Sequence, residues 1–176
     1  MEVGESGELI VSDNVAYSDG HKWDMPLMEQ LTSLDGRINR QRYLYLNLGA
    51  FVTGLIYLAI LGAFLSLLAF LVSGSSPESP GPVLVTIFLL PFYSVVYSLN
   101  VKRLQDTGRG GGWIRYAQVC LVLAVIYSMT PVDSEIESLM EAISAIVSFP
   151  LWIVCLFFKG EIGSNAFGPD PLSTSQ

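Results

Sequence analysis

Hydrophobic residues gather in long stretches of this chain, separated by short polar segments. Four stretches contain no Asp, Glu, Lys or Arg: residues 43–77, 79–101, 116–132 and 142–158. A helix that crosses the hydrocarbon core of a membrane needs about 20 mostly apolar residues, and about 17 at the lower limit. The pattern therefore predicts four spanning helices, at about 44–72, 83–100, 113–131 and 140–158.

The segments outside these stretches complete the predicted domain organisation. Residues 1–25 lack apolar periodicity and are rich in Glu, Asp, Ser and Gly, which predicts an acidic flexible tail. Residues 26–42 form a predicted amphipathic segment beside the membrane, because apolar residues recur there at helical spacing: Leu27, Met28, Leu31 and Leu34. This segment lies either on the membrane surface or on the bundle. Residues 43–159 are the predicted four-helix transmembrane domain, and glycine and proline breaks predict a carboxyl hook and tail over residues 160–176.

Composition agrees with a membrane protein, and the basic residues give it an orientation. Hydrophobic residues make up 51% of the chain and charged residues only 14%, against about a quarter in ordinary soluble domains. In the four-span arrangement all nine Lys and Arg fall on one side, and basic residues beside spans face the cytoplasm. The predicted fold class is therefore all-α: an integral membrane bundle of four transmembrane helices with both termini cytoplasmic.

The acidic net charge belongs mainly to the tail. The chain carries −7, and residues 1–30 hold seven acidic groups against Lys22 alone, so the rest of the chain is close to neutral. We expect no nucleic-acid partner, because such a partner requires a clustered basic surface.

The segment between the second and third predicted spans is the most polar part of the membrane domain. Residues 100–115, NVKRLQDTGRGGGWIR, contain four of the nine basic residues. Asp106, Thr107 and Gly108 supply turn chemistry, and three glycines follow Arg109. The segment therefore predicts a tight loop at the membrane surface.

Three separated polar pieces carry a resemblance to a known family. They are DGRINRQRY at residues 35–43, VKRLQDTGRGGGW at 101–113 and KGEIGSNAFGPDP at 159–171. Together they resemble the small bacterial inner-membrane proteins grouped as domain of unknown function 805, over about residues 34–171. The resemblance implies a multi-pass protein of the bacterial cytoplasmic membrane with the three motifs on the cytoplasmic side, and it brings no established activity. The motif positions carried over are Asp35, Gly36, Asn39, Thr107, Gly108, Trp113, Gly163, Asn165, Phe167, Gly168 and Pro169.

Two positions depart from the family pattern. Gln105 stands where such proteins usually have His, and Tyr43 is followed by Leu44 where an aromatic pair is often found. The absence of that His removes the motif side chain that would titrate near neutral pH.

A candidate site for a ligand or lipid headgroup comes from the charged residues of these motifs. Its members are Arg37, Arg40, Lys102, Arg103, Asp106 and Arg109. In one interpretation they bind an anionic headgroup or a phosphate, because arginine offers a fork of donors. In the other, the arginines fix the topology, Asp106 pairs with some of them, and the cluster clamps helix ends.

The sequence offers no enzymatic or metal chemistry. Neither a Walker-type phosphate loop nor a GxGxxG motif is present, and His21 stands alone in the tail. We therefore expect no catalytic residues, no metal and no cofactor. Cys120 and Cys155 fall at similar depth on antiparallel helices, where they could be neighbours, and we expect two inert thiols there.

The predicted spans contain only neutral polar side chains at depth: Asn47, Thr53, Thr86, Gln118 and Ser128. Ion pathways usually need ionisable groups there, so we expect hydrogen bonds between helices instead.

These observations favour a non-catalytic interaction or scaffold protein. Its partner is the lipid bilayer, with anionic headgroups or another membrane protein at a cytoplasmic basic patch. The alternative is an oligomeric channel or small-solute transporter, which four helices would form only as a homo-oligomer.

Overall fold

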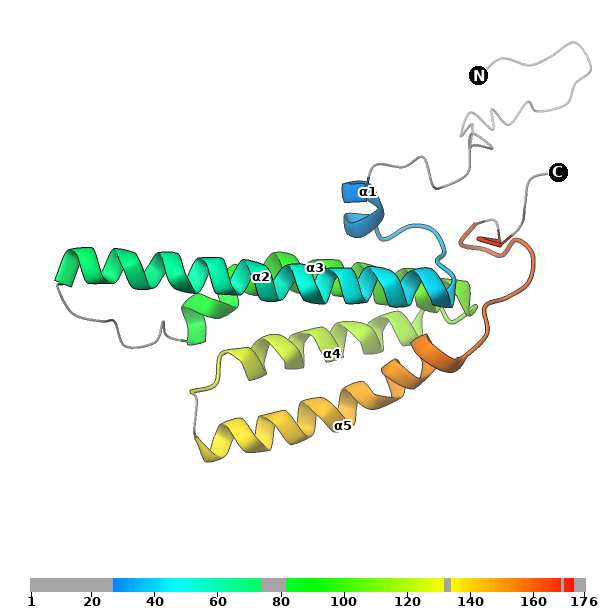
Figure 1. Ribbon diagram of the computed structural model, residues 1–176. Coiled ribbons are helices and arrows are strands. Elements are labelled where there is room, and N and C mark those ends of the chain that lie inside the picture. Colours follow the sequence, from blue (N-terminus) through cyan, green and yellow to red (C-terminus); the bar gives the residue numbers. More distant parts are fainter. Residues whose placement is uncertain (1–26, 74–81, 132–133, 169, 173–176) are drawn as a thin grey trace, which may run out of the picture.

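The computed structural model describes residues 27–73, 82–131, 134–168 and 170–172 (Figure 1). This part of the chain is all-helical. Its helices are α1 Leu27–Thr32, α2 Arg40–Ser73, α3 Pro82–Asp106, α4 Gly112–Ser128 and α5 Glu135–Phe157. The predicted tail over residues 1–25 and Pro169 lie outside the described residues.

Three helices, α2, α3 and α5, are long and apolar enough to cross a membrane. Helix α4 is apolar but has 17 residues, which gives a length of about 26 Å at 1.5 Å per residue. This is a little less than the roughly 30 Å hydrocarbon core. The all-α class and the membrane-protein class predicted from the pattern are therefore confirmed.

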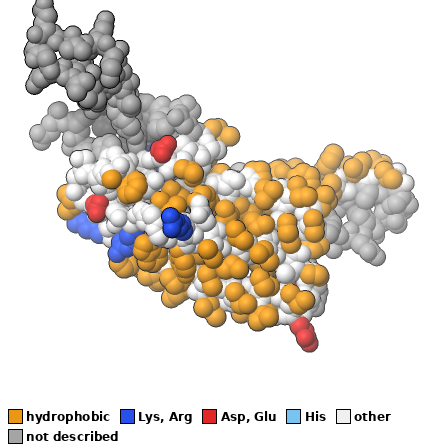
Figure 2. All heavy atoms as spheres, turned by 180° about the vertical axis from the view of Figure 1, so that it is seen from behind, with side chains coloured by type: hydrophobic (Ala, Val, Ile, Leu, Met, Phe, Trp, Pro, Cys, Tyr) orange, Lys and Arg blue, Asp and Glu red, His pale blue; other side chains and the backbone are white. Residues whose placement is uncertain are grey.

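The surface of the bundle is the surface of a protein in lipid. Large apolar side chains face outward along the long helices, for example at Val72, which is 81% exposed, and at Ile146, which is 73% exposed. Figure 2 shows hydrophobic side chains over most of the body of one face, with the visible Lys and Arg gathered towards one end. So large an apolar surface is typical of membrane contact.

Helix α3 is the centre of the bundle, because it contacts each of the other helices. Helix α4 packs on α5, and α2 packs on α3 and more lightly on α5. Since successive long helices run in opposite directions (Figure 1), α2 and α4 begin where α3 and α5 end. We call this the basic end, because it holds every Lys and Arg of the described residues: Arg37, Arg40, Arg42, Lys102, Arg103, Arg109, Arg115 and Lys159.

The expected loop over residues 100–115 is wrong in part. Helix α3 continues to Asp106 and α4 begins at Gly112, so the connection is only residues 107–111. The last turn of α3 is polar, yet it stays helical because it is buried against other segments. Helix α5 also begins earlier than the expected span, at Glu135, where Ser134 caps it by accepting a hydrogen bond from the Glu137 amide at 3.1 Å.

Polar groups inside the bundle behave as expected at one place and differently at another. The Thr86 hydroxyl of α3 donates to the Ser128 carbonyl of α4 at 2.8 Å and lies 3.0 Å from the Ser128 hydroxyl. This confirms a bond between helices. The same expectation is wrong for Asn47, which donates to the Tyr43 carbonyl one turn back in its own helix.

Helix α1 packs against α3, so the described part of the amphipathic segment lies on the bundle. Between α1 and α2, Asn39 caps α2, since its side-chain oxygen accepts a hydrogen bond from the Arg42 amide at 2.8 Å. The cap explains why α2 begins at Arg40, before the expected start of the span.

Candidate functional site

The basic end is built around one carboxylate, that of Asp106 on the last turn of α3. Arg37, which precedes α2, donates through Nε to Asp106 Oδ1 at 3.2 Å. Arg103, one turn back on α3, makes a short ion pair with Asp106 Oδ2. All three residues are at least 97% buried. The sequence-based expectation that Asp106 pairs with some of the arginines is therefore confirmed, and we call these three residues the clamp.

Arg103 also binds the end of α5, besides a longer hydrogen bond of 3.3 Å from its Nη1 to the Ile38 carbonyl. Its Nε donates to the Cys155 carbonyl at 2.9 Å and its Nη2 to the Phe158 carbonyl at 2.5 Å. The last carbonyls of a helix have no partner within the helix and carry partial negative charge. A buried cation placed there satisfies them, so Arg103 fixes the end of α5 to α3.

Arg37 binds the hook, the segment that follows α5. Its Nη1 donates to the Gly163 carbonyl at 2.6 Å, and its Nη2 donates to the Glu161 carbonyl at 2.5 Å. A longer contact of 3.4 Å joins Nη1 to the Gly168 carbonyl. The hook therefore wraps around a side chain that lies more than 120 residues earlier in the sequence.

Two glycines allow the hook to approach this closely. A Cβ atom on Gly160 would lie 2.2 Å from a carboxylate oxygen of Asp106, and one on Gly108 would lie 2.1 Å from Glu161 Oε1. Gly108 also has φ +70°, a conformation that favours glycine. The close approach lets the Glu161 amide donate to the Asp106 carbonyl at 2.8 Å, which ties the hook to the end of α3.

Side chains within the hook give it a defined shape. Asn165 donates through Nδ2 to the Gln105 carbonyl at 3.0 Å and to Glu161 Oε2 at 2.8 Å, and its Oδ1 accepts from the Phe167 amide. The Asp170 carboxylate accepts hydrogen bonds from the amides of Gly163 and Leu172, each at 2.9 Å. These bonds favour the ionised form, so they lower the pKa of Asp170 below its ordinary value.

The other motif positions line or support this assembly. Gly36 is buried with φ +97°, and the buried Thr107 hydroxyl donates to the Leu104 carbonyl at 2.9 Å. Trp113 packs edge to face on Tyr116, with ring centroids 5.7 Å apart. Asp35 is exposed.

Gln105, one of the two residues that depart from the pattern of the resemblance, is 92% buried, and its Oε1 has no hydrogen-bond partner. It lines a hollow of about 440 Å³ with Asp35, Gly36, Asn165, Ala166, Phe167 and Gly168. The Gln105 side chain is therefore buried beside this hollow with its amide oxygen left without a hydrogen bond.

The six predicted ligand residues do not form one exposed patch. Arg37, Arg103 and Asp106 bind one another and backbone carbonyls, and Lys102 is also buried, with 4% exposed. Arg109 is half-buried, and its guanidinium lies 4.2 Å from the centroid of the Phe158 ring. Arg40 is exposed. The buried members act as internal ties between helix ends, which is the second of the two interpretations.

Two kinds of position at the basic end were not among the residues predicted from the sequence. Arg115 and Lys159 are exposed at the basic end, and their position beside apolar stretches was a signal that could have included them. The carbonyls that accept from Arg37 and Arg103 gave no signal, because every residue has a carbonyl and only the fold selects those that face an arginine.

The cysteines are both buried and free. Cys120 Sγ lies 3.7 Å from the Val147 carbonyl of α5, and Cys155 is eight residues further along that helix, or about 12 Å. The two thiols are therefore not neighbours. Among the described residues no group of three His, Cys, Asp or Glu side chains could hold a metal ion.

Comparison with known proteins agrees with the three motif pieces. No curated protein and no solved structure matches the chain. A family model described as a protein of unknown function, DUF805, matches residues 31–169. That region contains the clamp, the four long helices and the hook as far as Pro169, and the chain belongs to the DUF805 family.

Proposed function

We propose that this protein is a non-catalytic scaffold of the bacterial cytoplasmic membrane, whose basic end lies at the cytoplasmic surface and binds anionic lipid headgroups. The observation that carries the proposal is that some basic residues of this end are buried and others are exposed. Arg37 and Arg103 are buried in the clamp, where both bind Asp106. Arg40, Arg115 and Lys159 are exposed around it. We call these three exposed residues the basic rim.

The basic rim has the position that headgroup binding requires. Arg40 is the first residue of α2, Arg115 lies in the first turn of α4, and Lys159 follows the end of α5. All three therefore stand where apolar spans end, which is headgroup depth. Near an anionic membrane surface each Lys or Arg contributes about 1 kcal/mol of binding.

The clamp supports this role by fixing the rim in place. Arg103 joins the end of α5 to α3, and Arg37 joins the segment before α2 to the hook. The start of α2 and the end of α5, next to Arg40 and Lys159, are thus held by bonds that do not involve the rim residues. The orientation rests on the preference of basic residues for the cytoplasmic side of a membrane.

The test is the composition of the lipid that stays with the protein. Wild type, purified from bilayers of equal phosphatidylglycerol and phosphatidylcholine, is expected to retain mainly phosphatidylglycerol in native mass spectrometry. The triple variant Arg40→Gln, Arg115→Gln, Lys159→Gln is expected to lose that preference, with each charge changing affinity about fivefold at low salt.

A matched control neutralises charge at the other end of the bundle. Glu135→Gln together with Glu141→Gln changes residues of α5 far from the rim and is expected to leave the preference unchanged. Equal retention of the two lipids by wild type, or a preference that survives in the triple variant, would reject the proposal.

A further inference from the structure

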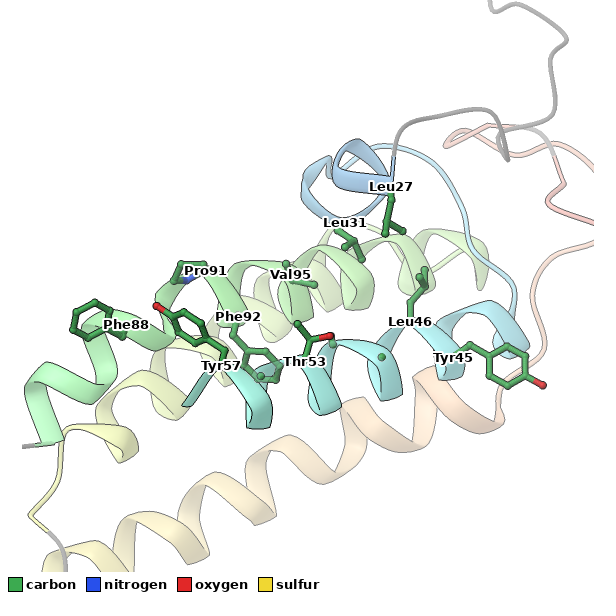
Figure 3. A pocket seen from close by; sticks show the side chains of 13 residues that line it. Leu27, Leu31, Tyr45, Leu46, Thr53, Tyr57, Phe88, Pro91, Phe92 and Val95 are labelled. Atoms are coloured by element: carbon green, nitrogen blue, oxygen red, sulfur yellow. The ribbon is translucent and has the colours of Figure 1, made fainter. Parts of the chain in front are cut away.

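A groove on the apolar side of the bundle has no role in the clamp or the rim. It lies between α1, α2 and α3 and has a volume of about 480 Å³ (Figure 3). Small residues of α2 line one side: Gly49, Ala50, Thr53 and Gly54. Phe88, Pro91, Phe92 and Val95 of α3 line the other, and Leu27 and Leu31 of α1 cover one end.

The sequence explains why the groove is open. A Cβ atom on Gly49 would meet nothing within 4 Å, whereas one on Gly54 would lie 3.1 Å from the Phe92 ring. A side chain therefore has room at Gly49, whereas the Phe92 ring leaves little room at Gly54. Pro91 inside α3 cannot make a normal helical hydrogen bond and favours a bend, which turns part of α3 away from α2.

The groove has the length of one membrane leaflet. It extends along α2 from Tyr45 to Tyr57, a separation of 12 residues or about 18 Å of helix. Half of the hydrocarbon core is about 15 Å. Since α2 is long and apolar enough to span a membrane and Tyr45 lies near its start at the basic end, the groove lies within the leaflet on that side.

The volume decides between the kinds of occupant. A helix about 10 Å in diameter would fill 480 Å³ with only about 6 Å of its length, roughly one turn. A transmembrane partner therefore does not fit inside the groove. A single hydrocarbon chain is thinner, and it gains dispersion contacts along the whole length of the walls.

We propose that the groove binds one acyl chain of a phospholipid from the leaflet on the basic-end side, held between α2 and α3 beneath α1. Lipid tails and apolar side chains do not drive each other together by the hydrophobic effect within a membrane, so close packing supplies the affinity. The small residues of α2 allow the chain to approach the helix backbone. Binding of the tail does not depend on headgroup charge.

The experiment compares two leucine substitutions on the same helix. Gly49 lines the groove and Gly62 does not, yet a Cβ atom on either would meet nothing within 4 Å. Gly49→Leu therefore fills the groove, and Gly62→Leu adds the same side chain elsewhere. The probe is phosphatidylcholine that carries a photoreactive diazirine in one acyl chain, in bilayers without anionic lipid.

Wild type and Gly62→Leu are expected to retain one phosphatidylcholine in native mass spectrometry and to cross-link at residues 45–57 and 88–95. Gly49→Leu is expected to lose both the retained lipid and the cross-links in the groove, while cross-links at outward-facing Ile60 remain. Equal retention by the two variants would overturn the proposal, as would equal cross-linking of the groove residues in both.

Two further measurements keep the result decisive. If Gly49→Leu does not fold, Thr53→Leu fills the same groove, and a wild-type map without groove cross-links is itself sufficient to reject the proposal. The triple rim variant is expected to retain this zwitterionic lipid as wild type does, so loss of the rim function and loss of the groove are distinguishable.

Discussion

The two ends of the helical bundle are held together in different ways. At the basic end, side chains of α3 and of the segment before α2 reach α5 and the hook through buried ion pairs and hydrogen bonds to carbonyls. At the opposite end, α3 and α4 meet through Thr86 and Ser128. There α2 extends past the other helices, with Leu71 and Val72 largely exposed (Figure 1).

The difference bears on which contacts specify the arrangement of the helices. Apolar packing in a membrane tolerates many arrangements, because lipid is as apolar as the helices. Buried charges tolerate few, because each must find its partners. We infer that the basic end contributes more than the opposite end to which helices meet, because its buried charges bind defined partners on α3, α5 and the hook.

The largest expected effect is the removal of the carboxylate at the centre of the clamp. Asp106→Ala leaves Arg37 and Arg103 buried without their counter-charge, and breaking a buried pair in this way costs about 3–5 kcal/mol. The free energy of unfolding in bicelles, measured by steric trapping, is expected to fall by that amount.

Asp35→Ala is the control for this loss, because it removes an exposed carboxylate at the same end. Its effect is expected to stay within about 0.5 kcal/mol. If both variants lower the free energy of unfolding by the same amount, the buried ion pairs of Asp106 do not stabilise the basic end.

A smaller effect is expected at the opposite end. Thr86→Val keeps the shape of the side chain and removes its hydrogen bond to Ser128, and such bonds in membranes average about 0.6 kcal/mol with a maximum of about 1.7. Ser94→Ala is the matched control, since the Ser94 hydroxyl donates to Leu90 of its own helix. A loss for Thr86→Val as large as that of Asp106→Ala would remove the contrast between the ends.

The smallest effect concerns the hook at acid pH. The amides of Gly163 and Leu172 lower the pKa of Asp170. The ionised carboxylate therefore stabilises the hook, and this contribution is complete at pH values above the ordinary pKa of 3.8. The contribution is lost as the pH falls through the lowered pKa.

Nuclear magnetic resonance can follow this step directly. The amide signals of Gly163 and Leu172 are expected to shift together with the Asp170 carboxyl as it is protonated, at a pH below 3.8. In Asp170→Asn this common pH-dependent shift of the two amide signals is expected to disappear. If the wild-type amide signals do not shift as Asp170 is protonated, the carboxylate does not hold the hook.

The sequence predicted the spans well because hydropathy in lipid is a local property. A run without charge is apolar whatever it packs against, and the runs at residues 43–77 and 79–101 contain most of α2 and α3. The clustering of basic residues at one end followed from the same pattern. The pairing of Asp106 with arginines was foreseen because opposite charges beside adjacent spans lie at the same depth.

The burial of the clamp could not be read in the same way. Residues 102–106 are mostly polar and precede a glycine-rich turn, which resembles a surface loop. They are helical and buried because the segment before α2, the end of α5 and the hook all bind them, and the last two are about 50 residues or more away. The groove was likewise hidden, since its volume depends on where α1 rests and where α3 bends.

The long reach of Arg37 has a consequence for how the chain is made. Arg37 is synthesised more than 120 residues before the Gly163 and Glu161 carbonyls that accept its hydrogen bonds. Until then Arg37 lacks these acceptors, so the contact between the segment before α2 and the hook forms only after α2, α3, α4 and α5 have been made. In a chain that stops after α5, Arg37 would keep its bond to Asp106 and lose those to Glu161 and Gly163, so the segment before α2 would be tied to α3 alone.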